Sequence, residues 1–352
     1  MITGSITSNT QTPTAGTPSL SRDMLNPKQL IDEALLPVAG DLEALGPLLL
    51  KLLECNTISG NHILNHVLAG GGKRIRPALF FLASRIVGYS GPHLNPMAAV
   101  CEYVHTASLL HDDVIDSSTV RRGKPTPNCI WGDEAAVLVG DLIYARASEL
   151  MAETGSLEIV SMFARAIRLM SDGELLQLEH LFNPAMSEET YLKIIKHKTA
   201  VLLAAACKAP AVLGGASAAD CEALSEFGRC LGYAFQLLDD ALDYAGTDSI
   251  FGKRTLADFP EGKITLPIIL LKSLATPAEW NFVESLIHEE SVSAASMKKI
   301  LELVDFYDTA GKTLEAASKW TESALTALAH FPPNSARFDL ENLANRLLVR
   351  FS

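Results

Sequence analysis

The sequence predicts an all-α fold, and three observations lead to that prediction. Apolar residues recur with a period near 3.6 along almost the whole chain, as in amphipathic helices. No run of alternating apolar and polar residues indicates a strand. Breakers separate the periodic runs, at residues 70–72, 91–92, 123–127, 183–184 and 246–263. A solenoid is not expected, because no repeat of about 30–45 residues is evident.

Each periodic run between two breakers is expected to form one helix. In chain order these runs are 31–53, 63–68, 78–87, 97–110, 135–153, 157–181, 188–207, 218–244 and 266–274, followed by polar-faced helices in the C-terminal third. Residues 1–24 are rich in Thr, Ser, Pro and Gly and are expected to be a disordered tail. Residues 25–352 are expected to form a single domain of many helices.

Composition and charge limit the function and the compartment. Hydrophobic residues make up 48% of the 352 residues, and 41 acidic against 29 basic residues give a net charge of −12. This balance argues against binding to nucleic acid or to an anionic membrane, although local positive charge can still bind an anionic substrate. The first 21 residues carry neither a basic region nor an apolar core of a signal peptide.

The cysteines and the most apolar segment indicate a cytoplasmic protein. The six cysteines form no CxxC pair and are expected to be buried thiols in a reducing compartment. The apolar segment 199–216 is interrupted by Lys208 and Pro210, so we expect a core helix there. We therefore expect a cytoplasmic protein with no transmembrane segment.

Two acidic clusters each follow an apolar helical run. The first, HDDVID, places Asp112 and Asp116 on one helix face, about 6 Å apart along the axis. The second, DDALD, repeats this spacing with Asp239 and Asp243. One such cluster also fits a solvated helix face, but two of them favour facing carboxylates. Mg²⁺ prefers carboxylates combined with water and phosphate oxygens, and the sequence has no zinc-type set of His and Cys.

Basic residues gather in five short segments, several of them at breakers. The segments are Lys73, Arg74 and Arg76; Arg121, Arg122 and Lys124; Lys196 and Lys198; Lys253 and Arg254; and Lys263. Guanidinium and ammonium groups beside Mg²⁺ are what a diphosphate needs. Any one segment also fits a solvated surface, but all five with two carboxylate clusters suggest a site for two diphosphates.

Seven ordered segments carry a resemblance to a known family. They are GGKRIRP at 71–77, residues 105–116, RRG at 121–123, Gly140-Asp141, Lys198-Thr199, FQLLDDALDY at 235–244, and residues 252–267. On these motifs the chain resembles the trans-isoprenyl diphosphate synthases of the polyprenyl synthetase family. The resemblance is strongest to bacterial long-chain members of the octaprenyl diphosphate synthase type.

The resemblance implies a fold, a reaction and partners. The fold is an isoprenoid synthase bundle of helices around a central cavity. The reaction is the Mg²⁺-dependent head-to-tail (1′-4) condensation of isopentenyl diphosphate onto an allylic diphosphate, with farnesyl diphosphate as the expected primer and a homodimer as the expected assembly. The allylic diphosphate loses pyrophosphate, isopentenyl diphosphate attacks the cation, and the released pyrophosphate takes a proton. Cations fixed in advance would stabilise the leaving group, and the helices would exclude water.

The resemblance also implies a role for each site residue. The Mg²⁺ ligands would be Asp112, Asp116 and Asp239, supported by Asp240 and Asp243. The residues around the allylic diphosphate would be Arg121, Lys198 and Lys263, with Thr199 and Gln236 placing oxygens near the carbocation. The residues around isopentenyl diphosphate would be Lys73, Arg76, His105 and Arg122. The catalytic residues would be Lys198, Thr199, Gln236 and Lys253. Lys253 would lie over the departing pyrophosphate.

Product length is predicted from small residues that precede the first acidic cluster. On the helix face leading to Asp112 these residues are Cys101, Val104, Ala107 and Ser108. Short-chain relatives carry aromatic rings just before the aspartates, so their absence predicts a product longer than geranylgeranyl diphosphate. Octaprenyl relatives often carry Phe where this chain has Ser148. Loss of that ring would deepen the groove, although Ser148 equally fits an ordinary helix residue.

Four other functions compete with this interpretation. A shorter-chain farnesyl or geranylgeranyl diphosphate synthase would use the same chemistry. A terpene cyclase would share the fold but would need no pocket for isopentenyl diphosphate. An HD-type phosphohydrolase would use His105, His111 and Asp112 and leave the second acidic cluster idle. A non-catalytic partner subunit would be expected to lack some of the acidic or basic motif residues that this chain keeps.

Overall fold

A computed structural model describes residues 27–53, 55–68, 72–245, 256–289 and 291–349. Within these ranges the protein is all-α except for one short hairpin. The α-helices are α1 (Pro27–Ala34), α2 (Ala39–Lys51), α3 (Ile58–Leu68), α4 (Ile75–Ile86), α5 (Leu94–Ile115), α6 (Pro127–Trp131), α7 (Asp133–Glu153), α8 (Leu157–Glu179), α9 (Glu188–Ile195), α10 (Val201–Leu213), α11 (Ala218–Ala245), α12 (Leu266–Leu274), α13 (Pro277–Ile287), α14 (Ala294–Phe306), α15 (Thr309–Leu328) and α16 (Ser335–Val349). The expected tail, 1–24, lies outside the described residues.

Most of the expected helices are confirmed, and two are interrupted. The run 31–53 is broken by a 3-10 turn, η1 (Leu36–Val38), because Pro37 has no N–H to donate and restricts the residue before it. The run 188–207 is broken by a π-helical turn, η2 (Lys196–Ala200), between α9 and α10.

One hairpin was not expected from the sequence. Strands β1 (Val120–Arg121) and β2 (Lys124–Pro125) pair antiparallel across a two-residue turn. Arg122 and Gly123 both have positive φ, of 53° and 74°, as the favoured hairpin turn requires. Strands of two residues are too short to produce a recognisable alternation, so only the breaker at 123–127 was visible in the sequence.

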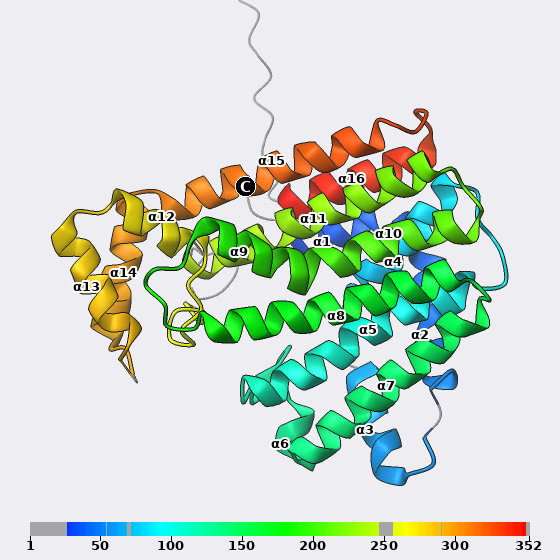
Figure 1. Cartoon of the computed structure of the whole chain (residues 1–352), viewed down its shortest axis with the longest axis horizontal. Coiled ribbons are helices and arrows are strands. Elements are labelled where there is room, and N and C mark those ends of the chain that lie inside the picture. Colours follow the sequence, from blue (N-terminus) through cyan, green and yellow to red (C-terminus); the bar gives the residue numbers. More distant parts are fainter. Residues whose placement is uncertain (1–26, 54, 69–71, 246–255, 290, 350–352) are drawn as a thin grey trace, which may run out of the picture.

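The long helices pack against one another, and three helices of the C-terminal third lie at one end of the molecule (Figure 1). α11 packs along α15 and α10, α10 also contacts α4 and α8, and α5 packs against α7 (Figure 1). α12, α13 and α14 lie at one end of the molecule, on the left in Figure 1. No helix in the described part of the chain is both long and apolar enough to cross a membrane.

Two apolar clusters make up the core, and they meet within α11 and at the start of α10. The first contains Leu231 and Leu202, and the second contains Tyr233 and Ala200. The larger cluster joins helices of the N-terminal half to α10 and α16, and the smaller one joins α9 to α12–α15. Polar side chains at this junction are held in fixed positions by the apolar packing on both sides.

The cysteines follow the sequence prediction only in part. Cys101, Cys207, Cys221 and Cys230 are buried, and all six thiols are free. The expectation of burial was wrong for Cys129, which is exposed on the five-residue surface helix α6, while Cys55 is half-buried. A short helix at the surface has no second layer of side chains to cover such a thiol.

Candidate active site

The π turn η2 places Lys198 and Thr199 between α8 and α11. A π turn adds a residue to a helical turn, and such turns are frequent at functional sites. Both neighbouring helices approach η2 at a glycine. A Cβ atom on Gly173 of α8 would lie 2.7 Å from the His197 Cβ, and one on Gly232 of α11 would lie 2.4 Å from the Ala200 Cα. Glycine at these two positions therefore allows both helices to support the turn.

A chain of hydrogen bonds runs from Thr199 across α11 to α9. The Thr199 hydroxyl donates to Gln236 Oε1 at 2.9 Å, and Gln236 Nε2 donates to Asp240 Oδ1 at 2.8 Å. The Tyr191 hydroxyl donates to Asp240 Oδ2 at 2.5 Å. Burial raises the pKa of Asp240 to about 6, although both hydrogen bonds favour the charged form. The orientation of the Gln236 amide is thus set by a buried carboxylate.

The second acidic cluster also anchors the segment that follows α11. The Asp243 carboxylate accepts hydrogen bonds from the backbone N–H groups of Ala257 and Asp258, at 3.0 and 3.1 Å. Burial, followed by the charges of Asp240 and Asp243, raises the pKa of Asp258 to about 8. The N–H of Lys263 donates in turn to the Asp258 carbonyl oxygen at 2.9 Å. These bonds fix the backbone from which Lys263 extends.

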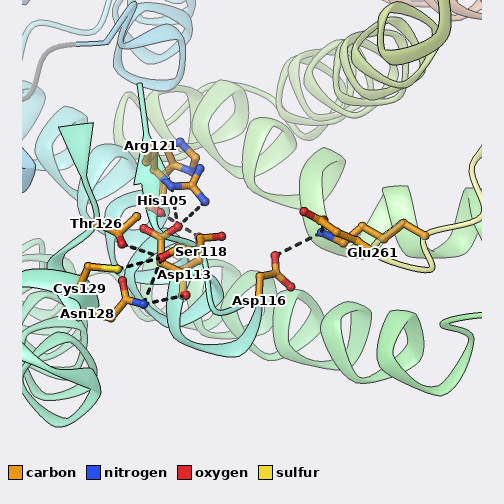
Figure 2. Close-up of polar contacts among 11 residues, drawn as sticks. His105, Asp113, Asp116, Ser118, Arg121, Thr126, Asn128, Cys129 and Glu261 are labelled. Atoms are coloured by element: carbon orange, nitrogen blue, oxygen red, sulfur yellow. Dashed lines mark hydrogen bonds and ion pairs between the residues drawn. The ribbon is translucent and has the colours of Figure 1, made fainter. Parts of the chain in front are cut away.

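Lys263 connects this segment to the first acidic cluster. Its Nζ lies 3.2 Å from Asp116 Oδ2 and 2.7 Å from Glu261 Oε2. Asp116 and Glu261 are labelled in Figure 2. The Lys263 and Asp116 side chains are 19% and 26% exposed, so water screens the pair only in part. Burial opposes the charge on Lys263, but Glu261 and Asp116 together raise its pKa.

Lys198 lies where two cavities adjoin. One, of about 190 Å³, is lined by Thr199, Gln236, Asp240 and Lys263. The other, of about 310 Å³, is lined by Asp112, Ser108, Tyr144, Met170 and Glu174, and Lys198 lines both. Burial, followed by the charge of Glu174, raises the pKa of Asp112 to about 6, while Lys198 lowers it. The structure thus brings together side chains from both acidic clusters and two of the predicted cations.

The middle aspartate of the first cluster points elsewhere. Asp113 is buried and accepts hydrogen bonds from the Arg121 guanidinium, at 2.8 Å from Nε and 2.7 Å from Nη2 (Figure 2). Asn128 Nδ2 donates to the Asp113 carbonyl oxygen at 3.3 Å. Asp113 therefore holds the β1–β2 hairpin against the end of α5, whereas Asp112 faces the cavity.

A third and smaller cavity, of about 70 Å³, lies on the hairpin side of α5. Its lining includes His105, Arg121, Arg122 and Glu102. Burial lowers the pKa of His105 well below its ordinary value, and Arg76 and Arg122 lower it further. The predicted residues His105 and Arg122 are thus close together, and Arg121 joins them here although it was expected beside Lys198 and Lys263.

Arg76 lies near residues that line this third cavity, whereas Lys73 contacts α1. Burial lowers the pKa of Arg76 to about 10, and the charges of Glu102 and Asp239 oppose that shift. Lys73 forms an ion pair with Asp32 of α1. Lys253 falls outside the described residues. In the described part of the chain, no three His, Cys, Asp or Glu side chains converge closely enough to hold a metal ion by themselves.

Comparison with known proteins identifies the family. The sequence profile of the polyprenyl synthetase family matches residues 60–304. The chain belongs to the polyprenyl synthetase family. It is 37% identical to the octaprenyl diphosphate synthase of Escherichia coli K12 over 312 residues, which cover 89% of this chain and 96% of the relative.

Solved structures of this synthetase family also match the fold. A decaprenyl diphosphate synthase from Rhodobacter capsulatus has a TM-score of 0.87 and 37% identity, covering 92% of this chain and 99% of its own. A polyprenyl synthase from Caulobacter crescentus CB15, complexed with calcium and isoprenyl diphosphate, has a TM-score of 0.86 and 40% identity, covering 92% and 98%. The predicted all-α isoprenoid synthase fold is confirmed, and this polyprenyl synthetase is a trans-prenyltransferase.

The four residues predicted to set product length occupy three different environments in this synthetase. Val104 and Ala107 are fully buried, as is Cys101. Ser108 lines the 310 Å³ cavity, and its hydroxyl donates to the His105 carbonyl oxygen at 2.8 Å. Ser148 lies on the exposed face of α7 and lines none of the cavities described above. Its role in chain length stays a prediction.

Sequence reasoning missed several polar groups of this polyprenyl synthetase site. Glu174 and Gln177 of α8 contact Lys198, Tyr191 supports Asp240, and Glu102 lies beside the third cavity. In the sequence, Glu174 and Gln177 lie three residues apart directly after Gly173. This spacing was the one sequence feature that could have drawn attention to them. A glutamate and a glutamine on a long helix indicate no site until their tertiary partner is known.

Proposed function

We propose that this synthetase makes a long-chain all-trans polyprenyl diphosphate, octaprenyl-like in length, by adding isopentenyl diphosphate to an allylic diphosphate such as farnesyl diphosphate. The observation that carries the proposal is the position of Lys198. It lines the cavity that holds Asp112 and also the cavity that holds Asp240. One substrate can therefore place its diphosphate at the junction and its chain in the larger cavity.

Mg²⁺ is the proposed cofactor, held by Asp112, Asp116 and Asp239. Their carboxylate oxygens are the donors that a hard divalent cation prefers, with diphosphate oxygens and water completing the shell. When bound, the ion would neutralise the charge that develops on the leaving pyrophosphate. The calcium in the Caulobacter relative supports a divalent cation in this family.

The cations proposed to bind the allylic diphosphate are already positioned by carboxylates. Lys263 pairs with Asp116, and Lys198 pairs with Glu174. Arg121, also proposed to contact this diphosphate, is held by Asp113 on the hairpin side of α5. A metal-bound diphosphate brings its own negative charge to these cations. Because the side chains are held in advance, little reorganisation is needed while the carbon–oxygen bond breaks.

Thr199 and Gln236 are the proposed neighbours of the allylic carbocation. Asp240 accepts from the Gln236 amide nitrogen, so the amide oxygen faces Thr199. Both oxygens can turn a partial negative charge toward the cation without attacking it. Isopentenyl diphosphate is proposed to bind with Lys73, Arg76, His105 and Arg122. The lowered pKa of His105 favours the neutral imidazole, which can donate or accept a hydrogen bond.

We also propose a domain organisation, an assembly and roles for five further residues. Residues 25–352 are proposed to act as one domain, and two copies are proposed to form a homodimer in the cytoplasm. Lys253 is proposed to lie over the departing pyrophosphate. Ala107, Ser108, Val104 and Ser148 are proposed to influence product length, their small side chains leaving room for a long prenyl chain.

The test is an elongation assay with purified protein. We would incubate it with farnesyl diphosphate, labelled isopentenyl diphosphate and Mg²⁺, remove the phosphates enzymatically, and size the polyprenols by chromatography. We expect a ladder that ends in one long polyprenol. Parallel reactions with EDTA and with Asp112→Asn should give no ladder, whereas Glu322→Gln, an exposed carboxylate on α15, should leave the ladder unchanged.

Other outcomes would favour the competing functions. A ladder that stops at a farnesyl or geranylgeranyl product would support the shorter-chain synthase. A hydrocarbon formed without isopentenyl diphosphate would support a cyclase, and phosphate release alone would support a hydrolase. No incorporation with any allylic primer would point to a partner subunit.

A further inference from the structure

Glu174 holds the cation at the junction of the two cavities. Its Oε2 lies 2.5 Å from Lys198 Nζ, and the same ammonium donates to Gln177 Oε1 at 3.0 Å. The Glu174 and Lys198 side chains are only 13% and 24% exposed. Two acceptors on consecutive turns of α8 therefore fix one ammonium group in a partly dry position.

The position of Glu174 in the larger cavity points to a role in the reaction. Glu174 lines the same cavity as Asp112, so two carboxylates of like charge share a poorly solvated space. Two negative charges in such a space need a cation beside them. Lys198 lies against both cavities and compensates this charge only as long as it stays where Glu174 holds it.

We propose that Glu174 is a positioning residue for Lys198: its carboxylate, assisted by Gln177, holds the ammonium at the cavity junction where an allylic diphosphate must bind. The inference rests on the proposed function, since it needs Lys198 to contact the diphosphate. Glu174 itself contacts Lys198 and not the reacting atoms. When the diphosphate arrives, its oxygens replace the Glu174 carboxylate as partners of an ammonium that is already in place.

The proposal predicts that Glu174 acts only through Lys198. Glu174→Ala should lower kcat by about 10- to 100-fold, the loss expected from a misplaced charged group, and leave KM for isopentenyl diphosphate unchanged. Glu174→Gln keeps an acceptor oxygen at the same reach, so its kcat should fall between those of Glu174→Ala and the wild type. Glu179→Ala, an exposed glutamate on the same helix, is the matched control and should keep wild-type kcat.

The decisive experiment is a double-mutant cycle with Lys198→Ala in the elongation assay. Glu174→Ala added to Lys198→Ala should change kcat by no more than about twofold, because the group that Glu174 positions is already gone. If Glu174→Ala does not fold, as judged by circular dichroism and its melting temperature, the same cycle is run with Glu174→Gln. Losses that multiply in the double variant would overturn the inference, as would a Glu174→Ala enzyme that behaves like Glu179→Ala.

Two failures can be told apart in this design. If wild-type protein incorporates no label, the proposed function fails and takes this inference with it. If wild type elongates and Lys198→Ala is impaired, the proposed function stands. A multiplicative loss in the double variant then overturns the role of Glu174 alone.

Discussion

The Lys263 ammonium lies 3.2 Å from the Asp116 carboxylate, although 147 positions separate the two residues in the chain. Asp116 ends the helix that carries the first acidic cluster, and Lys263 follows the second cluster. The pair therefore joins the two halves of the site. The pair also places the Lys263 ammonium beside a proposed metal ligand. A bound diphosphate could contact both the ammonium and the metal ion there.

Replacing Lys263 should impair the chemical step. Lys263→Ala removes a cation that is fixed before the substrate binds, so we expect kcat to fall by about 100-fold, as when one preorganised group of a charge-stabilising site is lost. KM for the allylic diphosphate should rise, while KM for isopentenyl diphosphate should stay the same. Lys298→Ala, whose side chain is 78% exposed on α14, is the control. Equal kinetics for the two variants would remove Lys263 from the site.

Product length should respond to bulk at Ser108. Ser108→Phe would place a ring in the 310 Å³ cavity beside Met170 and Tyr144, so we expect the polyprenol ladder to end at a shorter product. Ala107→Phe should also shorten the product, but Ala107 is fully buried, so overpacking should destabilise that variant by about 1–3 kcal/mol. An unchanged ladder from a folded Ser108→Phe enzyme would show that the growing prenyl chain does not occupy this cavity.

The close approach of α11 to the π turn should be sensitive to a single methyl group. In Gly232→Ala the new Cβ would lie 2.4 Å from the Ala200 Cα, so the helices must separate. We expect the free energy of unfolding in urea to fall by about 1–3 kcal/mol. Gly40→Ala is the opposite control, since nothing lies within 4 Å of its added Cβ, and alanine in a helix should stabilise by about 0.5–1 kcal/mol.

The stability of the metal-free protein should depend on pH through Asp258. Burial raises its pKa to about 8 in the folded state, whereas an unfolded aspartate titrates near pH 3.9. Between about pH 4 and pH 8 the folded state therefore holds a proton that the unfolded state releases, and the free energy of unfolding falls as pH rises. Asp258→Asn should flatten this slope in urea titrations with EDTA. If the free energy of unfolding depends on pH equally in the wild type and in Asp258→Asn, Asp258 is not the group responsible.

The fold class and the spacing of the acidic clusters could be predicted from the sequence because both are encoded locally. The helical period of the apolar residues survives in every long helix of the described chain, and the spacing of Asp112 and Asp116 on α5 follows from that period alone. The sequence could not predict the turn η2, because the extra residue of a π turn does not interrupt the pattern of apolar residues. Nor could it predict the hairpin at Arg121, whose strands are only two residues long.

The residues that can carry charge, and the helix ends they occupy, can be read directly from the amino-acid order. The pairing of each cation with a particular carboxylate depends instead on how the helices pack. Asp112 and Asp113 are adjacent on one helix, yet Asp113 is buried against Arg121 while Asp112 faces the cavity beside Lys198. The physical reason is that neighbouring residues on a helix point about 100° apart. Which direction faces the site depends on how α5, α8 and the hairpin pack together.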